Sequence, residues 1–363
     1  MNVALLNPCY WPEVRRGSER FARELADGLL ARGHRPRLIT SHAHRPSFAD
    51  EDGLEVVRSW RPPSGRLRRR GWEDHLTHLP FTYLQLLRGD DDVAHALYPT
   101  DALAALRWKA RTGRPVILSF MGIPHRAWLA ARRGRTGAVV RAMRGADAVV
   151  ALSETAAGAF ERWLGVRPRV IAPGVDLEAF APGPGRAAVP TILCAADHTQ
   201  PRKRVALLVE AFRLVRRERP DARLVLSSVR GRPAPAGDGV EERDLDDRAT
   251  LAAANREAWV AVLPSIGEAF GLVALEALAC GTPVVASDRD ALPEVVASPD
   301  YGRLFAGDEP GPLAAALLEA LELAADPATP AACRARAEQF STDRCAEAYL
   351  ALYEEVVAGA RVR

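Results

Sequence analysis

The sequence predicts two α/β domains, each built on a mainly parallel sheet. Three observations lead to this class: the 363 residues exceed the size at which one core usually stops growing, 48% of them are apolar, and short apolar runs alternate twice with helix-length stretches. A stretch rich in proline and glycine, 172–190, separates the two series. We therefore predict an N-terminal domain at 1–180 and a C-terminal domain at 185–342.

The first series begins with a strand over 2–6 and a helix near 18–32, for which Ser18 can provide the N-cap and Gly33 the end. Its further apolar or β-branched runs predict strands at 37–40, 54–58, 93–97, 116–119 and 148–152. Parallel strands with crossover helices follow from this alternation.

The second series repeats the pattern. Its predicted strands are 191–195, 223–227, 259–263 and 284–287, and its predicted helices are near 205–218, 248–255 and 272–280. The terminal segment 343–363 contains an amphipathic helix over 343–358, which can pack on either domain, including back on the first. Because open parallel sheets bind ligands beyond the carboxyl ends of their strands, we expect a binding cleft between two facing domains.

Composition excludes several classes of protein. No apolar run approaches the roughly 20 residues that span a bilayer, and Met1 leads directly into a strand-like run without a basic leader, so we expect a soluble cytoplasmic protein. The five cysteines are odd in number and show no spacing typical of metal ligands, which argues against a disulfide framework or a metal site. These cysteines are Cys9, Cys194, Cys280, Cys333 and Cys345.

Charge is distributed unequally. Residues 1–180 carry a net charge of +9, and the remainder carries −6. Nearly all of the positive charge is arginine, which resembles codon bias more than adaptation to nucleic acid, so we predict no nucleic-acid partner. Arg66 and Arg68 to Arg70 lie beside Trp72, where they can meet an anionic acceptor or a membrane surface, or form a solvated loop.

The stretch 267–287 predicts a phosphate-binding device. A loop with Gly267 and Gly271 follows a strand and opens a helix, so the backbone amides of Phe270, Gly271 and Leu272 are available to phosphate oxygens. Glu276 is the only polar residue of the helix 272–280. A buried carboxylate needs hydrogen-bond donors, and ribose hydroxyls are suitable donors.

Glu268 lies in the same loop, where its carboxylate can accept hydrogen bonds from the hydroxyls of a sugar. A purely structural interpretation stays open from spacing alone. In that interpretation Glu268 is a solvated acid favoured by the helix dipole, and Glu276 pairs with an arginine.

Glu268 and Glu276, in their Gly-Glu-Ala-Phe-Gly setting, resemble the E-x7-E motif of the retaining glycosyltransferase family 4. The chain also resembles this family, in the same order, at 7–34, 151–160, 172–180, 201–215 and 292–305. Members of the family have the GT-B fold of two facing Rossmann-like domains. The resemblance therefore implies that fold and the binding of a nucleotide sugar.

The resemblance also implies roles for single residues. Glu268 would contact the transferred sugar, Glu276 the ribose, and Lys203 the leaving diphosphate, which its ammonium would neutralise. The amides of Phe270, Gly271 and Leu272 would hold the diphosphate, and Arg202 lies beside Lys203. The implied reaction retains the anomeric configuration and requires no metal and no cofactor, with a UDP or GDP sugar as co-substrate.

Two positions depart from the family pattern. Ala196-Asp197 stands where the family usually has glycine and arginine, so Arg202, Arg204 or His198 would have to supply the charge, or the donor is held differently, or Asp197 binds a cation. Met121 stands near a common family histidine, for which His125 is the substitute we consider.

Gly17 and Ser18 fall in the family's glycine loop, beside the acceptor and the phosphates, although "RGSE" replaces the more usual double glycine.

Two functions from different classes follow. The first is a glycosyltransferase whose acceptor, a small natural product, a sugar phosphate, a lipid-linked sugar or a thiol, is selected by the basic N-terminal domain. The second is a nucleotide-sugar-binding protein that has lost catalysis and serves as a partner or regulatory subunit, which the departures at Asp197 and Met121 permit. An oxidoreductase is disfavoured because no GxGxxG follows Leu6.

Overall fold

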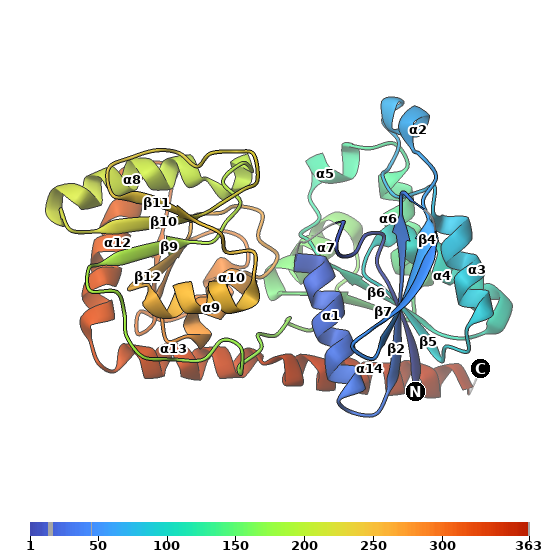
Figure 1. The fold of residues 1–363 in the computed structure, drawn as a ribbon. Coiled ribbons are helices and arrows are strands. Elements are labelled where there is room, and N and C mark those ends of the chain that lie inside the picture. The colour runs from blue at the N-terminus through green and yellow to red at the C-terminus, as the bar shows by residue number, and fades with distance from the viewer. Residues whose placement is uncertain (14–16, 45, 362–363) are drawn as a thin grey trace. The chain divides into compact units, whose positions relative to one another are not determined.

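The computed structural model describes residues 1–13, 17–44 and 46–361. The chain divides into two compact units, which are described separately (Figure 1). Unit 1 contains Met1–Ala172 together with the segment that begins at Thr342, and unit 2 contains Pro173–Ser341. Within the described ranges, no helix is long and apolar enough to cross a membrane.

In the described part of unit 1, an eight-stranded sheet runs in the order β3-β4-β2-β1-β5-β6-β7-β8. Neighbouring strands are parallel, except that β3 is antiparallel to β4. The strands are β1 (Asn2–Leu6), β2 (Arg35–His42), β3 (Ser47–Glu51), β4 (Leu54–Trp60), β5 (Val93–Ala96), β6 (Val116–Phe120), β7 (Ala148–Ala151) and β8 (Arg169–Val170).

Helices cover both faces of this sheet, as alternation along β1 requires. Val3 and Leu5 belong to one buried cluster, and Ala4 and Leu6 to the cluster on the opposite face. The first cluster includes side chains of α1 (Gly17–Leu30) and α14 (Thr342–Arg361). The remaining helices of the unit are α2 (Gly65–Arg69), α3 (Leu79–Arg88), α4 (Pro99–Thr112), α5 (Arg126–Ala130), α6 (Arg135–Gly145) and α7 (Glu154–Leu164).

Local sequence explains where several of these helices begin and end. Ser153 caps α7 by accepting a hydrogen bond from the Ala156 N–H, and Gly165 ends it in the left-handed conformation.

The edge strand β3 was not predicted from the sequence. Its signal was the Asp52-Gly53 turn, in which both residues have positive φ and the chain reverses into β4.

In the described part of unit 2, a six-stranded parallel sheet runs in the order β11-β10-β9-β12-β13-β14. The strands are β9 (Thr191–Cys194), β10 (Arg223–Ser227), β11 (Val240–Arg243), β12 (Val260–Leu263), β13 (Val284–Ser287) and β14 (Gly302–Phe305). The α/β class with two mainly parallel sheets is therefore confirmed.

Two long helices, α8 (Val205–Glu218) and α12 (Pro310–Ala325), pack on each other and on one face of this sheet. On the other face, α10 (Leu272–Ala279) packs on β12 and β13 and is itself covered by α13 (Thr329–Ala337). The shorter elements are η1 (Pro201–Lys203), α9 (Arg248–Glu257), α11 (Leu292–Val295) and η2 (Glu338–Phe340).

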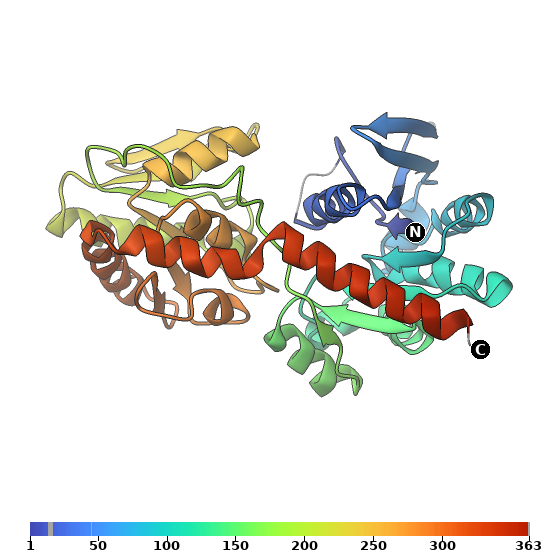
Figure 2. The same cartoon turned by 90° about the horizontal axis from the view of Figure 1, so that it is seen from below.

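The boundary between the units lies earlier than the predicted limit of residue 180. Residues 173–180 pack on unit 2, because Val175 forms an isolated bridge with Ser341, and Arg334 donates to the carbonyls of Leu177 and Phe180. The terminal helix α14 packs against α1 and so belongs to unit 1 (Figure 2).

Candidate functional site

The loop between β12 and α10 is held in a fixed conformation by two contacts. The Ile266 N–H donates to the Arg202 carbonyl at 2.8 Å, and the Gly267 N–H donates to Asp290 Oδ2 at 2.6 Å. Gly271 has φ +115°, and a Cβ there would lie 2.8 Å from Leu292 Cδ2. Glycine is therefore favoured at residue 271 by its backbone conformation, and a larger residue would also have to displace the Leu292 side chain.

This loop presents backbone donors at the start of α10. Gly271 is the N-cap and provides no side chain to the helix. Among the described residues, the amides of Phe270, Gly271 and Leu272 have no recorded hydrogen-bond acceptor. Because the N-terminus of a helix carries partial positive charge, these three amides can bind an anion.

A lysine and a glutamate meet beside this loop. Lys203 Nζ lies 2.6 Å from Glu268 Oε1, and both side chains are about 85% buried, with exposed fractions of 14% and 15%. Arg202 approaches the same oxygen at 3.3 Å, but its side chain is 47% exposed. Residues 65 positions apart therefore form one charged cluster, in which a single carboxylate faces two cations.

Glu276 lies one helical turn after Leu272 and is fully buried. The helix around it is apolar on every side, as the sequence predicted, since its neighbours Leu275 and Ala277 are equally buried. The structure thus places Glu268 in a mostly buried ionic cluster and Glu276 in the interior of unit 2. The two carboxylates of the motif have different environments.

Asp197 has its own partners. Its carboxylate accepts hydrogen bonds from the Thr199 N–H at 2.9 Å, the Thr199 hydroxyl at 2.6 Å and the Gln200 side-chain amide at 2.7 Å. Burial works to raise the pKa of Asp197, but these hydrogen bonds outweigh it and hold the pKa below its usual value. Asp197 therefore stays ionised and closes the turn that leads to Lys203.

The three candidates to compensate for Asp197 differ in availability. Arg204 pairs with Asp308 at 2.8 Å and donates to the Gly307 carbonyl at 2.6 Å, so its guanidinium is committed to the loop after β14. Arg202 is half-exposed beside Glu268. His198 Nε2 is buried and has no hydrogen-bond partner among the described residues.

The residues of unit 1 that the sequence assigned to the site lie at helix starts and at the edge of the core. Gly17 opens α1 and Ser18 follows it, while residues 14–16 of the same loop lie outside the described residues. His125 is the N-cap of α5, where its Nδ1 accepts from the Trp128 N–H at 3.2 Å. Met121 packs at the edge of the core. His125 thus has a structural partner that the sequence did not predict.

A polar cluster that the sequence did not predict lies at the carboxyl edge of the unit 1 sheet. His78 Nε2 lies 2.9 Å from Asp101 Oδ1, and both side chains are buried. Nearby, His75 Nδ1 lies 4.0 Å from Cys9 Sγ, and burial lowers the pKa of His75 and raises that of Cys9 to about 11. The positions of these residues in the sequence could have indicated the cluster, because Cys9 follows β1 and Asp101 follows β5. The carboxyl ends of parallel strands meet at one edge of a sheet.

Two family models match the chain. The one described as Glycosyltransferase Family 4 matches residues 15–179, and the one described as Glycosyl transferases group 1 matches residues 189–323. The chain belongs to glycosyltransferase family 4.

Curated relatives of this family 4 member carry two kinds of name. A D-inositol 3-phosphate glycosyltransferase of Jonesia denitrificans is 35% identical over 53% of this chain and 52% of its own length. A phosphatidyl-myo-inositol mannosyltransferase of Mycolicibacterium smegmatis is 29% identical over 89% of this chain and 85% of its own. The chain thus spans about half the length of the first of these relatives.

Solved structures agree in fold. A sucrose-phosphate synthase from Thermosynechococcus elongatus has a TM-score of 0.84 at 22% identity, and the match covers 99% of both chains. The Anabaena protein HepE, solved in complex with UDP-glucose, has a TM-score of 0.75 at 17% identity, covering 99% of this chain and all of its own. These similarities confirm the GT-B fold.

Proposed function

We propose that this family 4 member is a retaining glycosyltransferase that takes its sugar from a nucleoside-diphosphate sugar. The observation that carries the proposal is the 2.6 Å pair between Lys203 Nζ and Glu268 Oε1, next to the loop whose amides open α10. A carboxylate for sugar hydroxyls, a cation and backbone donors for a diphosphate are thereby gathered around residues 268–272.

In this proposal the donor lies along the loop before α10. An ammonium group has three N–H donors, so Lys203 can bind Glu268 and a diphosphate oxygen at once. The amides of Phe270, Gly271 and Leu272 hold the other phosphate oxygens, and Arg202 adds charge from the solvent side. Glu276 accepts from the ribose, which supplies hydroxyl donors to a carboxylate within an apolar helix.

The chemistry we propose needs no side-chain nucleophile. The bond between the anomeric carbon and the phosphate oxygen breaks while the acceptor oxygen bonds to the same face of the sugar. The departing phosphate oxygen takes the proton that the acceptor loses, so charge and atoms balance without a further base. Lys203 and the loop amides stabilise the charge that develops on the diphosphate, and we propose that no divalent cation is required.

Asp197 sets a condition on this proposal. Because its pKa is lowered, its carboxylate cannot escape repulsion from a diphosphate by taking up a proton at neutral pH. Lys203 and Arg202 must therefore outweigh it. The same residue supports the second candidate, a nucleotide-sugar-binding protein without catalysis, in which Asp197 prevents the diphosphate from reaching a productive position.

The relatives supply candidates for the two substrates. HepE was solved with UDP-glucose, which supports UDP sugars as the first donors to test, with GDP sugars second. The names of the curated relatives support inositol phosphates and phosphatidylinositol as acceptors, beside sugar phosphates, small natural products and thiols.

A ligand-stabilisation experiment tests the proposal. A ligand that binds only the folded protein raises its melting temperature, by an amount that corresponds to about 2.7 kcal/mol at a hundred times the dissociation constant. We expect one of UDP, GDP, ADP, CDP and TDP to raise the melting temperature equally with magnesium and with EDTA. We also expect the matching sugar nucleotide to be consumed when an acceptor is present.

Two outcomes would contradict the transferase. If one nucleotide binds but its sugar is transferred to no acceptor, the binding protein without catalysis becomes the better description. If no nucleotide raises the melting temperature, Asp197 has abolished the diphosphate site. The variant Asp197→Arg, which places the family's cation there, should then restore binding if the loop is otherwise intact.

A further inference from the structure

Two distant segments of unit 1 form one surface feature, which we call the basic lobe and define as residues 61–74 and 126–135. The Glu73 N–H donates to the Arg133 carbonyl at 3.0 Å, and the Arg133 N–H donates to the Gly71 carbonyl at 2.7 Å. These bonds join the segment that carries α2 to the segment that carries α5. In Figure 1 α2 lies at the upper edge of unit 1.

A buried ion pair fixes the lobe from inside. The guanidinium of Arg135 binds Glu73 through two hydrogen bonds, one of them at 3.0 Å, and the exposed fractions of the two side chains are 8% and 4%. Arg135 also donates to the Trp128 carbonyl at 2.9 Å and lies 4.4 Å from the centre of the Trp128 ring. Separating the two side chains would leave a charge buried without its counterion, which costs free energy. The pair therefore keeps the two segments together.

The outer surface of the lobe is cationic. No acidic residue occurs in 61–72 or 126–135. The two acidic residues of the lobe are both paired, Glu73 with Arg135 and Asp74 with Arg132 at 3.6 Å. Six arginines of the lobe form no ion pair within the part of the chain that the structure describes: Arg66, Arg68, Arg69, Arg70, Arg126 and Arg133. Like charges gathered in this way repel each other unless an anion lies against them.

An indole lies among these arginines. Trp72 is 39% exposed, with the Arg133 guanidinium 5.9 Å from the ring centre and Gly134 beneath the ring. The helix α2 buries none of its residues, and its arginines Arg66, Arg68 and Arg69 are all exposed. Tryptophan and arginine combine an apolar body with a polar or charged group, and they are enriched where a protein meets the boundary between water and lipid.

We propose that the basic lobe is a docking surface for a bilayer that contains anionic phospholipid. The arginines provide attraction to the negatively charged headgroups, and Trp72 provides apolar contact at the level of the headgroups. The surface is formed around two short helices, α2 and α5. This docking does not depend on the transfer reaction proposed above, because vesicle binding can be measured without a donor or an acceptor.

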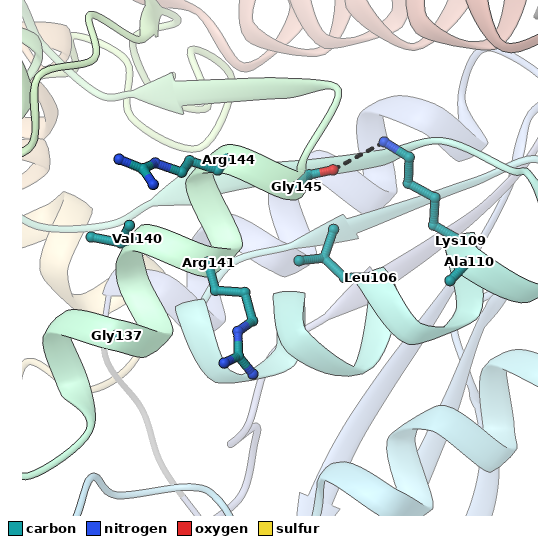
Figure 3. Close-up of a pocket in the computed structure, with 8 residues that line it drawn as sticks. All are labelled: Leu106, Lys109, Ala110, Gly137, Val140, Arg141, Arg144 and Gly145. Atoms are coloured by element: carbon teal, nitrogen blue, oxygen red, sulfur yellow. Dashed lines mark hydrogen bonds between the residues drawn. The ribbon is translucent and has the colours of Figure 1, made fainter.

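A second basic feature of unit 1 provides a control. The groove between α4 and α6 has a volume of about 660 Å³ and an apolar lining that includes Leu106 and Val140 (Figure 3). Its lysine, Lys109, is already bound to Asp147 at 2.8 Å and to the Gly145 carbonyl at 3.0 Å. Only Arg141 and Arg144 remain as cations at this groove, so we expect it to bind anionic membranes far less than the lobe.

The experiment compares two variants that lose the same number of charges. Sedimentation with vesicles is measured for the full chain, using phosphatidylcholine alone or mixed with phosphatidylglycerol. The lobe variant carries glutamine in place of Arg66, Arg68, Arg69 and Arg70. The control variant carries glutamine in place of four exposed arginines elsewhere in unit 1, Arg88, Arg111, Arg141 and Arg144.

We expect the wild type to bind the mixed vesicles, to bind phosphatidylcholine weakly, and to lose affinity as salt is raised. The lobe variant should lose at least about tenfold in affinity, because each basic residue near an anionic surface contributes substantially. The control variant should lose much less. Trp72→Ala should weaken the binding that persists at high salt and leave the salt dependence unchanged.

Three results would overturn the proposal: no binding of the wild type to the mixed vesicles, equal losses in the two variants, or binding to a DNA duplex without binding to vesicles. The substituted side chains are exposed, so both variants should fold. An unchanged melting temperature, and an unchanged shift with whichever nucleotide stabilises the wild type, show that a loss of vesicle binding is local. If no nucleotide binds the wild type, the proposed function fails, while the vesicle result still decides the lobe.

Discussion

At the scale of single residues, Lys203 is the charge on which the proposed chemistry depends most. Its ammonium is mostly buried and lies 2.6 Å from Glu268, whereas Arg202 reaches the same carboxylate only at 3.3 Å from a half-exposed position. A charge in a water-poor position acts more strongly on a developing anion than an exposed charge does. The two cations should therefore contribute unequally to turnover.

We expect Lys203→Ala to lower kcat by about 100- to 1000-fold, the range typical for loss of one group that stabilises transition-state charge. Arg202→Ala is the matched control and should cost much less, since its side chain is 47% exposed and screened by solvent. Steady-state kinetics with the donor identified by the nucleotide panel measures both. Equal losses in the two variants would show that Lys203 has no special role.

The sequence predicted the components of this site but not their contacts. Gly271 and the start of α10 could be inferred, because a strand, a glycine loop and an apolar helix follow one another along the chain. The pairing of Lys203 with Glu268 could not be inferred from spacing, since it joins residues 65 positions apart through the fold of unit 2. The hydrogen bonds of Asp197 also depend on a local turn that its residue type does not specify.

At the scale of elements, the contact between α1 and α14 limits the size of one residue. A Cβ on Gly28 would lie 2.6 Å from the Ala346 Cβ, closer than two such atoms can approach. The two helices are therefore adjacent because α1 has glycine at this position. Gly158 in α7 is also helical, but a Cβ added there would meet nothing within 4 Å.

We expect Gly28→Ala to destabilise unit 1 by about 1–3 kcal/mol, because the extra methyl group overpacks the contact with α14. Gly158→Ala should instead stabilise the protein by about 0.5–1 kcal/mol, because alanine loses less backbone freedom than glycine on entering a helix. Urea unfolding curves of the two variants measure these changes. Stabilisation by both substitutions would mean that α14 can move away from α1 at little cost.

The same scale shows which elements could be predicted from the sequence. The bounds of buried strands such as β1 and β12 were predicted to within one residue. All residues of β12, and all but the first residue of β1, are apolar. Edge strands were missed, since β3 is polar at most positions and β8 contains only two residues. An edge strand has one neighbour and little buried surface, so its sequence carries a weak signal.

At the scale of the whole molecule, the end of the chain completes the core of the unit that contains its beginning. Tyr349 and Tyr353 of α14 are fully buried and belong to the same apolar cluster as β1 and α1. Beneath them His95 Nδ1 lies 2.7 Å from the Tyr353 hydroxyl, and His95 Nε2 lies 2.7 Å from the Ser119 hydroxyl. Burial lowers the pKa of His95 to about 3, so the ring is neutral and both of its nitrogens are satisfied by these hydroxyls.

This arrangement predicts that unit 1 cannot fold without residues 342–363. The side chains that α14 contributes to this apolar cluster are those of Cys345, Tyr349, Leu352, Tyr353 and Val356. At 1.5–3 kcal/mol for each large side chain, their removal costs roughly 10 kcal/mol, which is comparable to the stability of a whole domain. We expect a chain ending at Ser341 to lose the cooperative unfolding of unit 1 and to keep the nucleotide-dependent transition of unit 2 in calorimetry.

The variant Tyr353→Phe separates the role of the buried polar contact from that of the apolar face. It keeps the ring of α14 in the core but leaves one nitrogen of His95 buried without a partner, so unit 1 should still fold and lose about 1–3 kcal/mol. If the truncated chain instead unfolds with both transitions intact, the strands and α1 form a sufficient core alone. The contribution of α14 would then be limited to its surface ion pairs, such as Arg169 with Glu355 and Arg32 with Asp343.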